Sequence, residues 1–235
     1  MKPIPNQPDL VAQVFESIRD AICDGQFRPG QRLHQDELAT QLGVSRQPVV
    51  QALHLLKSQG FARDTGRRGV EVTALGVSET AQHYRIRTVL DGLAAREAAA
   101  NCDIKAARQR GSDIIRAGRT ACQSGRHRDI LDADMAFHQF IYDLSDNPVI
   151  AKTVMPLWHQ LRRIMGAAIT TDYPVNAIWD EHQKIFDAIL AGDPGGAETL
   201  ARAHGDTAAQ RVQQMQAERS SLTDTMDQPI SHQKQ

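Results

Sequence analysis

The sequence predicts a mainly α-helical protein, with a small N-terminal domain that ends in a short β hairpin and a larger antiparallel all-α bundle of about six helices. Three observations predict this architecture. Two short helical patterns and a glycine-tipped hairpin follow one another without a gap between residues 35 and 72. After residue 75, apolar residues recur at spacings of three and four, and β-branched runs are sparse. The length of 235 residues suits a small module plus a core of ordinary size.

Local signals predict two short helices joined by a glycine turn. The segment 36–42 has one apolar face, and Gly43 can supply the positive φ that ends a helix. Ser45 then stands at the N-cap of a helix that begins at Arg46, with Pro48 in the first turn, where a missing N–H is tolerated. This second helix has a buried stripe (Val49, Ala52, Leu53 and Leu56) and an outer face (Arg46, Gln47, Val50, Gln51 and His54).

A hairpin follows the second helix. Segments 61–64 and 70–72 have the composition of short strands, and the loop between them contains Gly66 and Gly69. The two helices and the hairpin together predict a winged helix-turn-helix, in which the outer helix face and the hairpin loop meet duplex DNA. The net charge of the chain is only −1, but between residues 41 and 70 five Lys or Arg stand against one acid, Asp64. The alternative explanation of this local excess of positive charge is a basic surface that is simply solvated and binds no DNA.

This region resembles the DNA-binding domain of GntR-type bacterial transcription regulators. The resemblance rests on residues 25–33 (Gly-Gln-Phe-Arg-Pro-Gly-Gln-Arg-Leu), 36–39 (Asp-Glu-Leu-Ala), 42–46 (Leu-Gly-Val-Ser-Arg), Pro48, Val49, Ala52, Leu53, Leu56, Gly60, Phe61, Arg68, Gly69 and Val70. It implies that the second helix reads the major groove and that the wing contacts the minor groove or the backbone. The DNA-contacting residues expected on this basis are Ser45, Arg46, Gln47, Gln51, Arg67, Arg68 and Gly69.

The sequence departs from that family in two ways. Many members have an Arg-Glu pair where this chain has Val50 and Gln51, and some have a basic residue in place of Asp36, so several family contacts with DNA do not carry over. A homodimer bound to a palindromic operator is expected, because two recognition helices about one helical turn apart read two half-sites.

Composition excludes several other classes of protein. The three cysteines are odd in number and widely spaced, which argues for reduced thiols and against a disulfide framework or a cysteine-rich zinc site. The N-terminus is polar and proline-rich, and no apolar run approaches the roughly 20 residues of a membrane span. A cytoplasmic protein without a membrane role is expected. The predicted domains are 1–74 for DNA binding, 75–218 for the bundle and 219–235 as a polar, disordered tail.

Helix breaks divide the bundle into about six helices. The breaks are expected at 101–103, 124–125, 147–148, 172–174 and 192–195. On the helix from about 129 to 145, Asp134 and His138 are spaced i, i+4 on an apolar face and point inward. His182 and His204 each fall in the apolar stripe of a further helix.

Three helices thus present one carboxylate and three imidazoles to the bundle interior. This donor set suits Zn, Ni, Mn or Fe as a divalent cation, with positions left open for water or a ligand. Taken singly, a histidine in such a position is more often a hydrogen-bonded core residue than a metal ligand.

The bundle resembles the FCD domain of the FadR branch of GntR regulators, and the resemblance of the whole chain to this branch covers about residues 11–217. The residues that carry it are 134–138 (Asp-Met-Ala-Phe-His), 181–189 (Glu-His-Gln-Lys-Ile-Phe-Asp-Ala-Ile) and 203–204 (Ala-His). In metal-binding members an Asp, the His one turn later and two later His hold the cation, which implies Asp134, His138, His182 and His204 here.

The same resemblance implies an effector site. Residues 84–91 (Tyr-Arg-Ile-Arg-Thr-Val-Leu-Asp), with Ala94 and Ala95, look like the family's Arg-x-x-Leu-Glu segment, with Asp91 in place of Glu. Arg87 is then expected to pair two-point with the carboxylate of an effector beside the metal, and Arg162 is a weaker candidate. The alternative for Arg87 is an intrahelical pair with Asp91.

The expected function is therefore a DNA-binding transcription regulator, by family default a repressor, controlled by a small carboxylate bound beside a divalent metal. A metal-sensing regulator without an organic effector is one alternative. A metal-dependent enzyme with Glu181 as base is another, which is disfavoured because Glu181 projects about 100° around its helix from His182. The protein is therefore not expected to be an enzyme.

Overall fold

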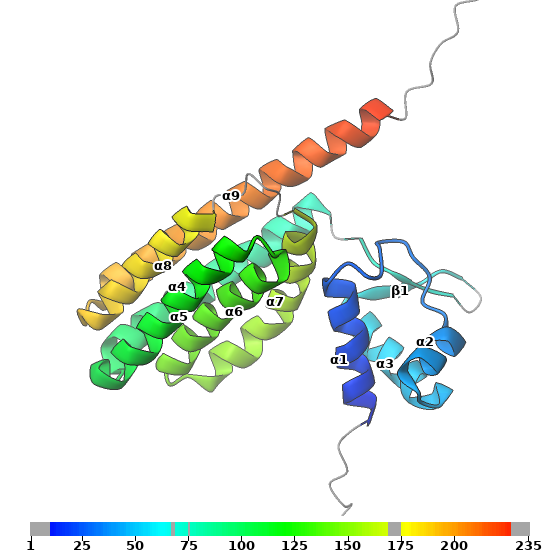
Figure 1. Cartoon of the computed structure of the whole chain (residues 1–235), viewed down its shortest axis with the longest axis horizontal. Helices are drawn as coiled ribbons and strands as arrows, with labels where there is room; N and C mark the ends of the chain where they lie inside the picture. Colours follow the sequence, from blue (N-terminus) through cyan, green and yellow to red (C-terminus); the bar gives the residue numbers. More distant parts are fainter. Residues whose placement is uncertain (1–9, 67–68, 75, 169–174, 227–235) are drawn as a thin grey trace, which may run out of the picture. The chain divides into compact units, whose positions relative to one another are not determined.

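The computed structural model describes residues 10–66, 69–74, 76–168 and 175–226 of the chain. The chain falls into two compact units, Met1–Leu75 and Gly76–Gln235, and each has its own hydrophobic core. Within the described ranges there are nine helices and one two-stranded sheet, which confirms the predicted mainly α fold class (Figure 1).

The N-terminal unit contains the predicted helix-turn-helix and hairpin. Gly43 ends the first helix of the motif with a φ of 64°, as its sequence context predicts. The two strands pair antiparallel, with Ala62 opposite Val72. The elements are α1 (Leu10–Cys23), α2 (Gln35–Leu42), α3 (Arg46–Ser58), β1 (Ala62–Asp64) and β2 (Val70–Val72).

Helix α3 has the two faces that the sequence predicts. Its stripe of Val49, Ala52, Leu53 and Leu56 is buried in the core of this unit, which α1 completes. Ser45 occupies the N-cap position in an extended conformation, but its side chain makes no capping hydrogen bond. One of the two usual donors to an N-cap side chain is the N–H of the third helical residue, and Pro48 has none.

The described residues of the second unit form a bundle of six helices, in agreement with the prediction. Asp103 caps the second of them, because its Oδ1 accepts from the N–H groups of Lys105 and Ala106. The predicted break at 172–174 lies outside the described residues. The bounds are α4 (Val77–Asn101), α5 (Ile104–Ser124), α6 (His127–Leu144), α7 (Pro148–Ala168), α8 (Val175–Leu190) and α9 (Pro194–Met226).

The C-terminal helix is longer than the sequence analysis expects. A disordered tail is predicted from residue 219, but α9 continues to Met226, and residues 227–235 lie outside the described part. The segment 213–219 is rich in Gln, Met, Ala, Glu and Arg, which have high helix propensity, and the helix continues from it through residues 220–226, whose Ser, Thr and Asp are weaker helix formers.

Glycines let pairs of helices in the bundle approach closely. A Cβ at Gly118 of α5 would overlap the ring of Trp179 of α8, and one at Gly205 of α9 would overlap Thr88 of α4. The ring of Trp179 in turn meets the ring of His182 edge-on, with 4.8 Å between their centroids. The close approach of α5 to α8 therefore helps to fix a histidine in the interior.

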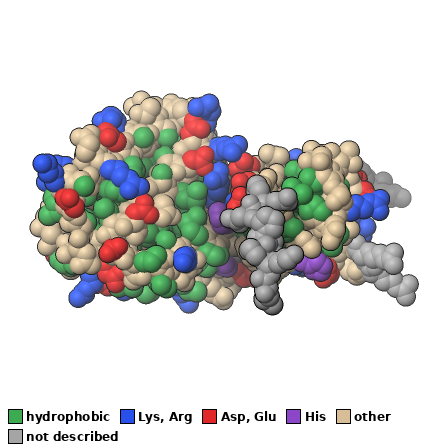
Figure 2. Space-filling model, turned by 90° about the horizontal axis from the view of Figure 1, so that it is seen from below, with side chains coloured by type: hydrophobic (Ala, Val, Ile, Leu, Met, Phe, Trp, Pro, Cys, Tyr) green, Lys and Arg blue, Asp and Glu red, His purple; other side chains and the backbone are tan. Residues whose placement is uncertain are grey.

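The visible face of the bundle carries charges of both signs between hydrophobic side chains (Figure 2). Exposed ion pairs such as Arg110 with Asp143, at 3.0 Å, lie on the bundle surface. Among the described residues, no helix combines the length and the apolar character needed to cross a bilayer.

Candidate functional site

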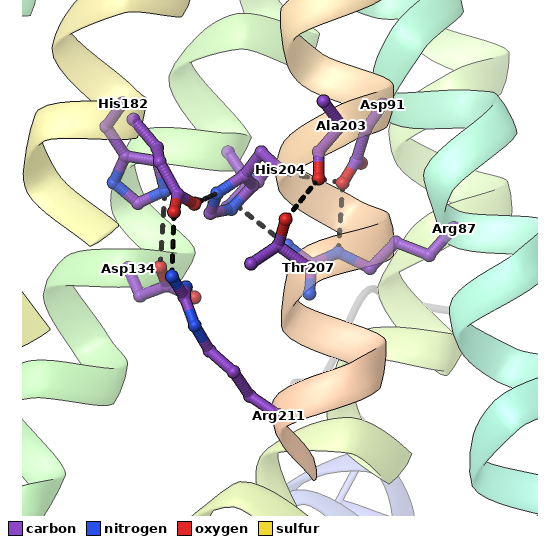
Figure 3. Close-up of polar contacts among 10 residues, drawn as sticks. Arg87, Asp91, Asp134, His182, Ala203, His204, Thr207 and Arg211 are labelled. Carbon is purple, nitrogen blue, oxygen red and sulfur yellow. Dashed lines mark hydrogen bonds and ion pairs between the residues drawn. The ribbon is translucent and has the colours of Figure 1, made fainter. Parts of the chain in front are cut away.

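The four residues predicted as metal ligands come together in the interior of the bundle. Asp134 and His138 belong to α6, His182 to α8 and His204 to α9. Figure 3 shows Asp134, His182 and His204 extending from three different helices toward one another. All four are buried, and one potential ligand atom from each lies within 4.8 Å of the others. The i, i+4 spacing on α6 brings two of them onto one face, and the packing of α8 and α9 adds the other two.

Distances within this cluster fit a shared cation. The Nε2 atoms of His182 and His204 are 3.2 Å apart, and His182 Nε2 lies 3.5 Å from Asp134 Oδ1. Two ligands of one divalent ion, each bound at its usual distance, lie about 3.0–3.4 Å apart. The donor set therefore suits a borderline divalent cation, and these two distances lie close to that spacing, within a cluster whose ligand atoms are all within 4.8 Å of one another.

Burial favours the neutral, metal-binding form of two of the histidines and acts in the opposite direction on the carboxyl group. Burial, together with the charge of Arg87, lowers the pKa of His138 well below its usual value. Burial likewise lowers the pKa of His182, so both imidazoles favour the neutral form, in which one ring nitrogen has a lone pair. Burial raises the pKa of Asp134, and the nearby Arg87 opposes that rise.

A carboxylate outside the cluster orients His204. Glu181 Oε2 lies 2.8 Å from His204 Nδ1, and Arg211 Nη2 donates to Glu181 Oε1 at 2.8 Å. Burial alone would raise the pKa of Glu181, but the hydrogen bonds from His204 and Arg211 lower it overall. An ionised Glu181 holds the N–H of His204 at Nδ1, so Nε2 faces the cluster as an acceptor.

From the sequence, Glu181 is expected only as a possible base, and Arg211 is not among the predicted site residues. A usable signal was present. Glu181 projects about 100° away from His182 around α8, and Arg211 lies seven residues, or about two turns, after His204 on α9, so both could meet beside His204. However, the packing of the bundle decides which side of α8 faces α9, and no local sequence pattern predicts it.

His182 is oriented by aromatic packing rather than by a second carboxylate. Its ring stacks on Phe137 at 4.1 Å between centroids and meets Trp179 edge-on at 4.8 Å. Its Nδ1 is buried and has no hydrogen-bond partner among the described residues.

Arg87 reaches the cluster from α4 and also forms the predicted alternative pair. Its side chain is 2 % exposed, its Nε donates to Asp91 Oδ2 at 3.0 Å, and its Nη2 lies 2.8 Å from His138 Nε2. The guanidinium also stacks over the ring of Trp158, with 3.6 Å from Cζ to the ring centroid. In Figure 3 the side chain of Arg87 extends from α4 toward the cluster. The intrahelical pair and the approach to the metal ligands therefore coexist.

Arg162, the weaker effector candidate, has a different environment. Its Nη1 forms an ion pair at 2.7 Å with Asp132 of α6, a carboxylate that is about half exposed and is not part of the cluster. Arg87 is thus the guanidinium that the structure brings to the four residues.

The predicted DNA-contacting residues lie on an accessible face of the N-terminal unit. Ser45, Arg46, Gln47 and Gln51 are exposed, and Gly69 is half-buried at the hairpin. Arg46 forms an ion pair with Asp36, and a groove of about 780 Å³ runs between α3 and the hairpin. Arg67 and Arg68 lie outside the described residues.

Comparisons with known proteins agree for both units. The model of bacterial regulatory proteins of the gntR family matches residues 10–72, and the FCD domain model matches residues 82–207. A relative from Paenarthrobacter nicotinovorans, named "Probable D-xylose utilization operon transcriptional repressor", is 29% identical over 80% of this chain and 82% of its own length.

Another relative, the "HTH-type transcriptional repressor RspR" of Escherichia coli, is 24% identical over 92% of this chain and 94% of its own length. The solved structure of McbR/YncC from E. coli has the same fold, with a TM-score of 0.77 at 21% identity, and the match covers 87% of this chain and 97% of that one. The chain therefore belongs to the GntR family of bacterial regulatory proteins, as a DNA-binding transcription regulator whose second domain is an FCD domain.

Proposed function

We propose that this regulator is a repressor whose binding to operator DNA is controlled by a small carboxylate, bound beside a divalent cation in the bundle. The observation that carries the proposal is the buried convergence of Asp134, His138, His182 and His204 with Arg87 at its edge. Residues 1–74 would bind DNA and residues 75–218 would bind metal and effector.

The cation would be held by one carboxylate oxygen and three imidazole nitrogens. This set suits Zn²⁺ best and also accommodates Ni²⁺, Mn²⁺ or Fe²⁺. An ion of higher coordination number keeps positions for an added oxygen ligand, and its charge would favour an anion at that place. Glu181 supports the assignment, because a metal-binding imidazole usually donates its other N–H to a carboxylate or carbonyl.

Arg87 is the proposed partner of the effector's carboxylate. A guanidinium offers a planar pair of N–H donors that match the two oxygens of a carboxylate. Because the side chains involved come from α4, α6, α8 and α9, an effector held by both Arg87 and the cation would contact several helices at once. Coupling to the DNA-binding domain would be reciprocal, so operator DNA would change effector affinity by the same factor.

Repression, dimerisation and location complete the proposal. The names of two relatives, from P. nicotinovorans and E. coli, describe repressors. A homodimer on a palindromic operator, acting in the cytoplasm, would place one α3 in each half-site. Ser45, Arg46, Gln47, Gln51 and Gly69, with Arg67 and Arg68, are the proposed DNA contacts.

A metal-sensing regulator without an organic effector is the second candidate. The cavity beside Asp91, His138 and Tyr142 measures only about 10 Å³, which is the space of about one water molecule. Such a small cavity has no room for an organic acid, which favours this second candidate. In a regulator of this kind the cation alone would control DNA binding, and carboxylic acids would have no effect.

Metal content tests the cation site. We expect purified protein to bind about one divalent cation per chain, and His182→Ala or His204→Ala to remove it because each deletes one of four ligands. Elemental analysis by mass spectrometry after dialysis measures this, with His54→Ala on the exposed side of α3 as the control. Unchanged metal content in both cluster variants would refute the assignment.

The role of Glu181 is tested by an isosteric change. Glu181→Gln removes the negative charge that holds the proton at His204 Nδ1, and loss of such an outer partner typically weakens metal binding by about 10- to 100-fold. Competition with a chromogenic zinc chelator measures the affinity. Asp180→Asn is the control, because Asp180 is also on α8 but is exposed and pairs with Arg119 of α5. This variant should leave the zinc affinity unchanged. Equal affinities for both variants would show that Glu181 does not position a ligand.

Operator binding tests the DNA face. Arg46→Ala should weaken binding to DNA from the region upstream of the gene by about 1–3 kcal/mol, because it removes a cation from the start of α3. Fluorescence anisotropy with labelled duplex measures the affinity, and circular dichroism and metal content should not change. Arg110→Ala, an exposed arginine of the bundle, is the control. An undiminished affinity for Arg46→Ala would exclude this residue from the interface.

A further inference from the structure

We propose that Arg87 is an internal competitor of the metal for His138, and that a carboxylate effector removes this competition. Cation and carboxylate would then bind cooperatively at one site. This inference rests on the proposed function, and it assigns Arg87 a task beyond holding the effector.

The orientation of His138 shows which ring nitrogen both Arg87 and the cation would bind. Its Nδ1 lies 3.5 Å from Asp91 Oδ2, while its Nε2 faces Arg87. His204 has the same arrangement, with Nδ1 beside Glu181 and Nε2 toward His182. In both rings a carboxylate flanks Nδ1, which leaves Nε2 as the metal-binding atom.

Arg87 forms a hydrogen bond with that nitrogen, His138 Nε2. Its Nη2 lies 2.8 Å from His138 Nε2, and because a guanidinium only donates hydrogen bonds, Nε2 must accept with its lone pair. A neutral imidazole has one such lone pair, and it cannot accept a hydrogen bond and bind a cation at the same time. The positive charge of Arg87 also opposes a second cation in a buried, weakly screened place.

Arg87 is held in this position by partners that do not bind the metal. Asp91 accepts from its Nε at 3.0 Å and receives a second hydrogen bond, at 2.5 Å, from Tyr142. Trp158 lies against the guanidinium and donates from Nε1 to the Tyr142 hydroxyl at 2.9 Å. Moving the guanidinium off His138 therefore needs another acceptor close to Asp91 and Trp158.

An effector carboxylate is such an acceptor. Its two oxygens match the Nη1 and Nη2 donors of a guanidinium, so binding can redirect Nη2 from His138 to the carboxylate. The 10 Å³ cavity beside His138 and Asp91 cannot hold an organic acid, so these side chains must move when one binds. The same movement frees His138 Nε2, which links acid binding to metal affinity.

Zinc affinity without any added acid gives the first test. In competition with a chromogenic chelator, Arg87→Met should bind Zn²⁺ about 10-fold or more tightly than the wild-type protein, because a charge-assisted hydrogen bond to the ligand atom is gone. Arg87→Met leaves Asp91 buried beside an apolar side chain, so Arg87→Met/Asp91→Asn, which removes both charges, is measured in parallel. Arg162→Met is the matched control and should change the zinc affinity by less than about twofold.

Acetate and glycolate at millimolar concentration give the second test. Either acid should tighten zinc binding to the wild-type protein and should have a clearly smaller effect on the two Arg87 variants, because the competitor is already gone and only the contact between acid and cation remains. Equal or weaker zinc binding by both Arg87 variants would overturn the competition. Unchanged wild-type affinity with both acids would overturn the coupling. Wild-type protein that binds no zinc at all would instead refute the proposed function itself.

Discussion

One physical constraint underlies the C-terminal unit: a carboxyl group and three imidazoles are kept out of water in the centre of a helical bundle. A buried polar atom without a partner costs about 1–3 kcal/mol, and His182 Nδ1, which has no partner among the described residues, bears such a cost, while other polar atoms of the cluster have partners. Glu181 is the partner on the outer side of His204, and aromatic rings enclose His182. On the inner side the acceptor atoms face one another at 3.2 and 3.5 Å, an arrangement that one divalent cation would satisfy.

The cluster also joins helices that are distant in the sequence. Its proposed ligands come from α6, α8 and α9, Arg87 and Asp91 from α4, and Trp158 from α7. Contacts such as Gly118 with Trp179 leave little free space between α5 and α8, so a change at His182 is transmitted to packed neighbours. A ligand can shift such a structure only by its difference in affinity between two arrangements of these helices, and the contested nitrogen of His138 is where that difference would arise.

Local chemistry explains what the sequence could predict. Gly43, Asp103 and the helix breaks depend on a few neighbouring residues, and the i, i+4 spacing of Asp134 and His138 follows from helix geometry. The contacts between Glu181 and His204, and between Arg87 and His138, depend on which helix faces lie together, so sequence patterns gave no direct sign of them. The length of α9 was underestimated because polar composition alone does not distinguish an exposed helix from a disordered tail.

X-ray absorption at the zinc edge, on protein loaded with one equivalent of Zn²⁺, is the most direct measurement of the proposed metal centre. We predict a first shell of nitrogen and oxygen at about 2.0–2.2 Å, with the multiple scattering of about three imidazoles. A shell that contains sulfur at about 2.3 Å, or one of oxygen atoms without imidazole scattering, would contradict coordination by Asp134, His138, His182 and His204.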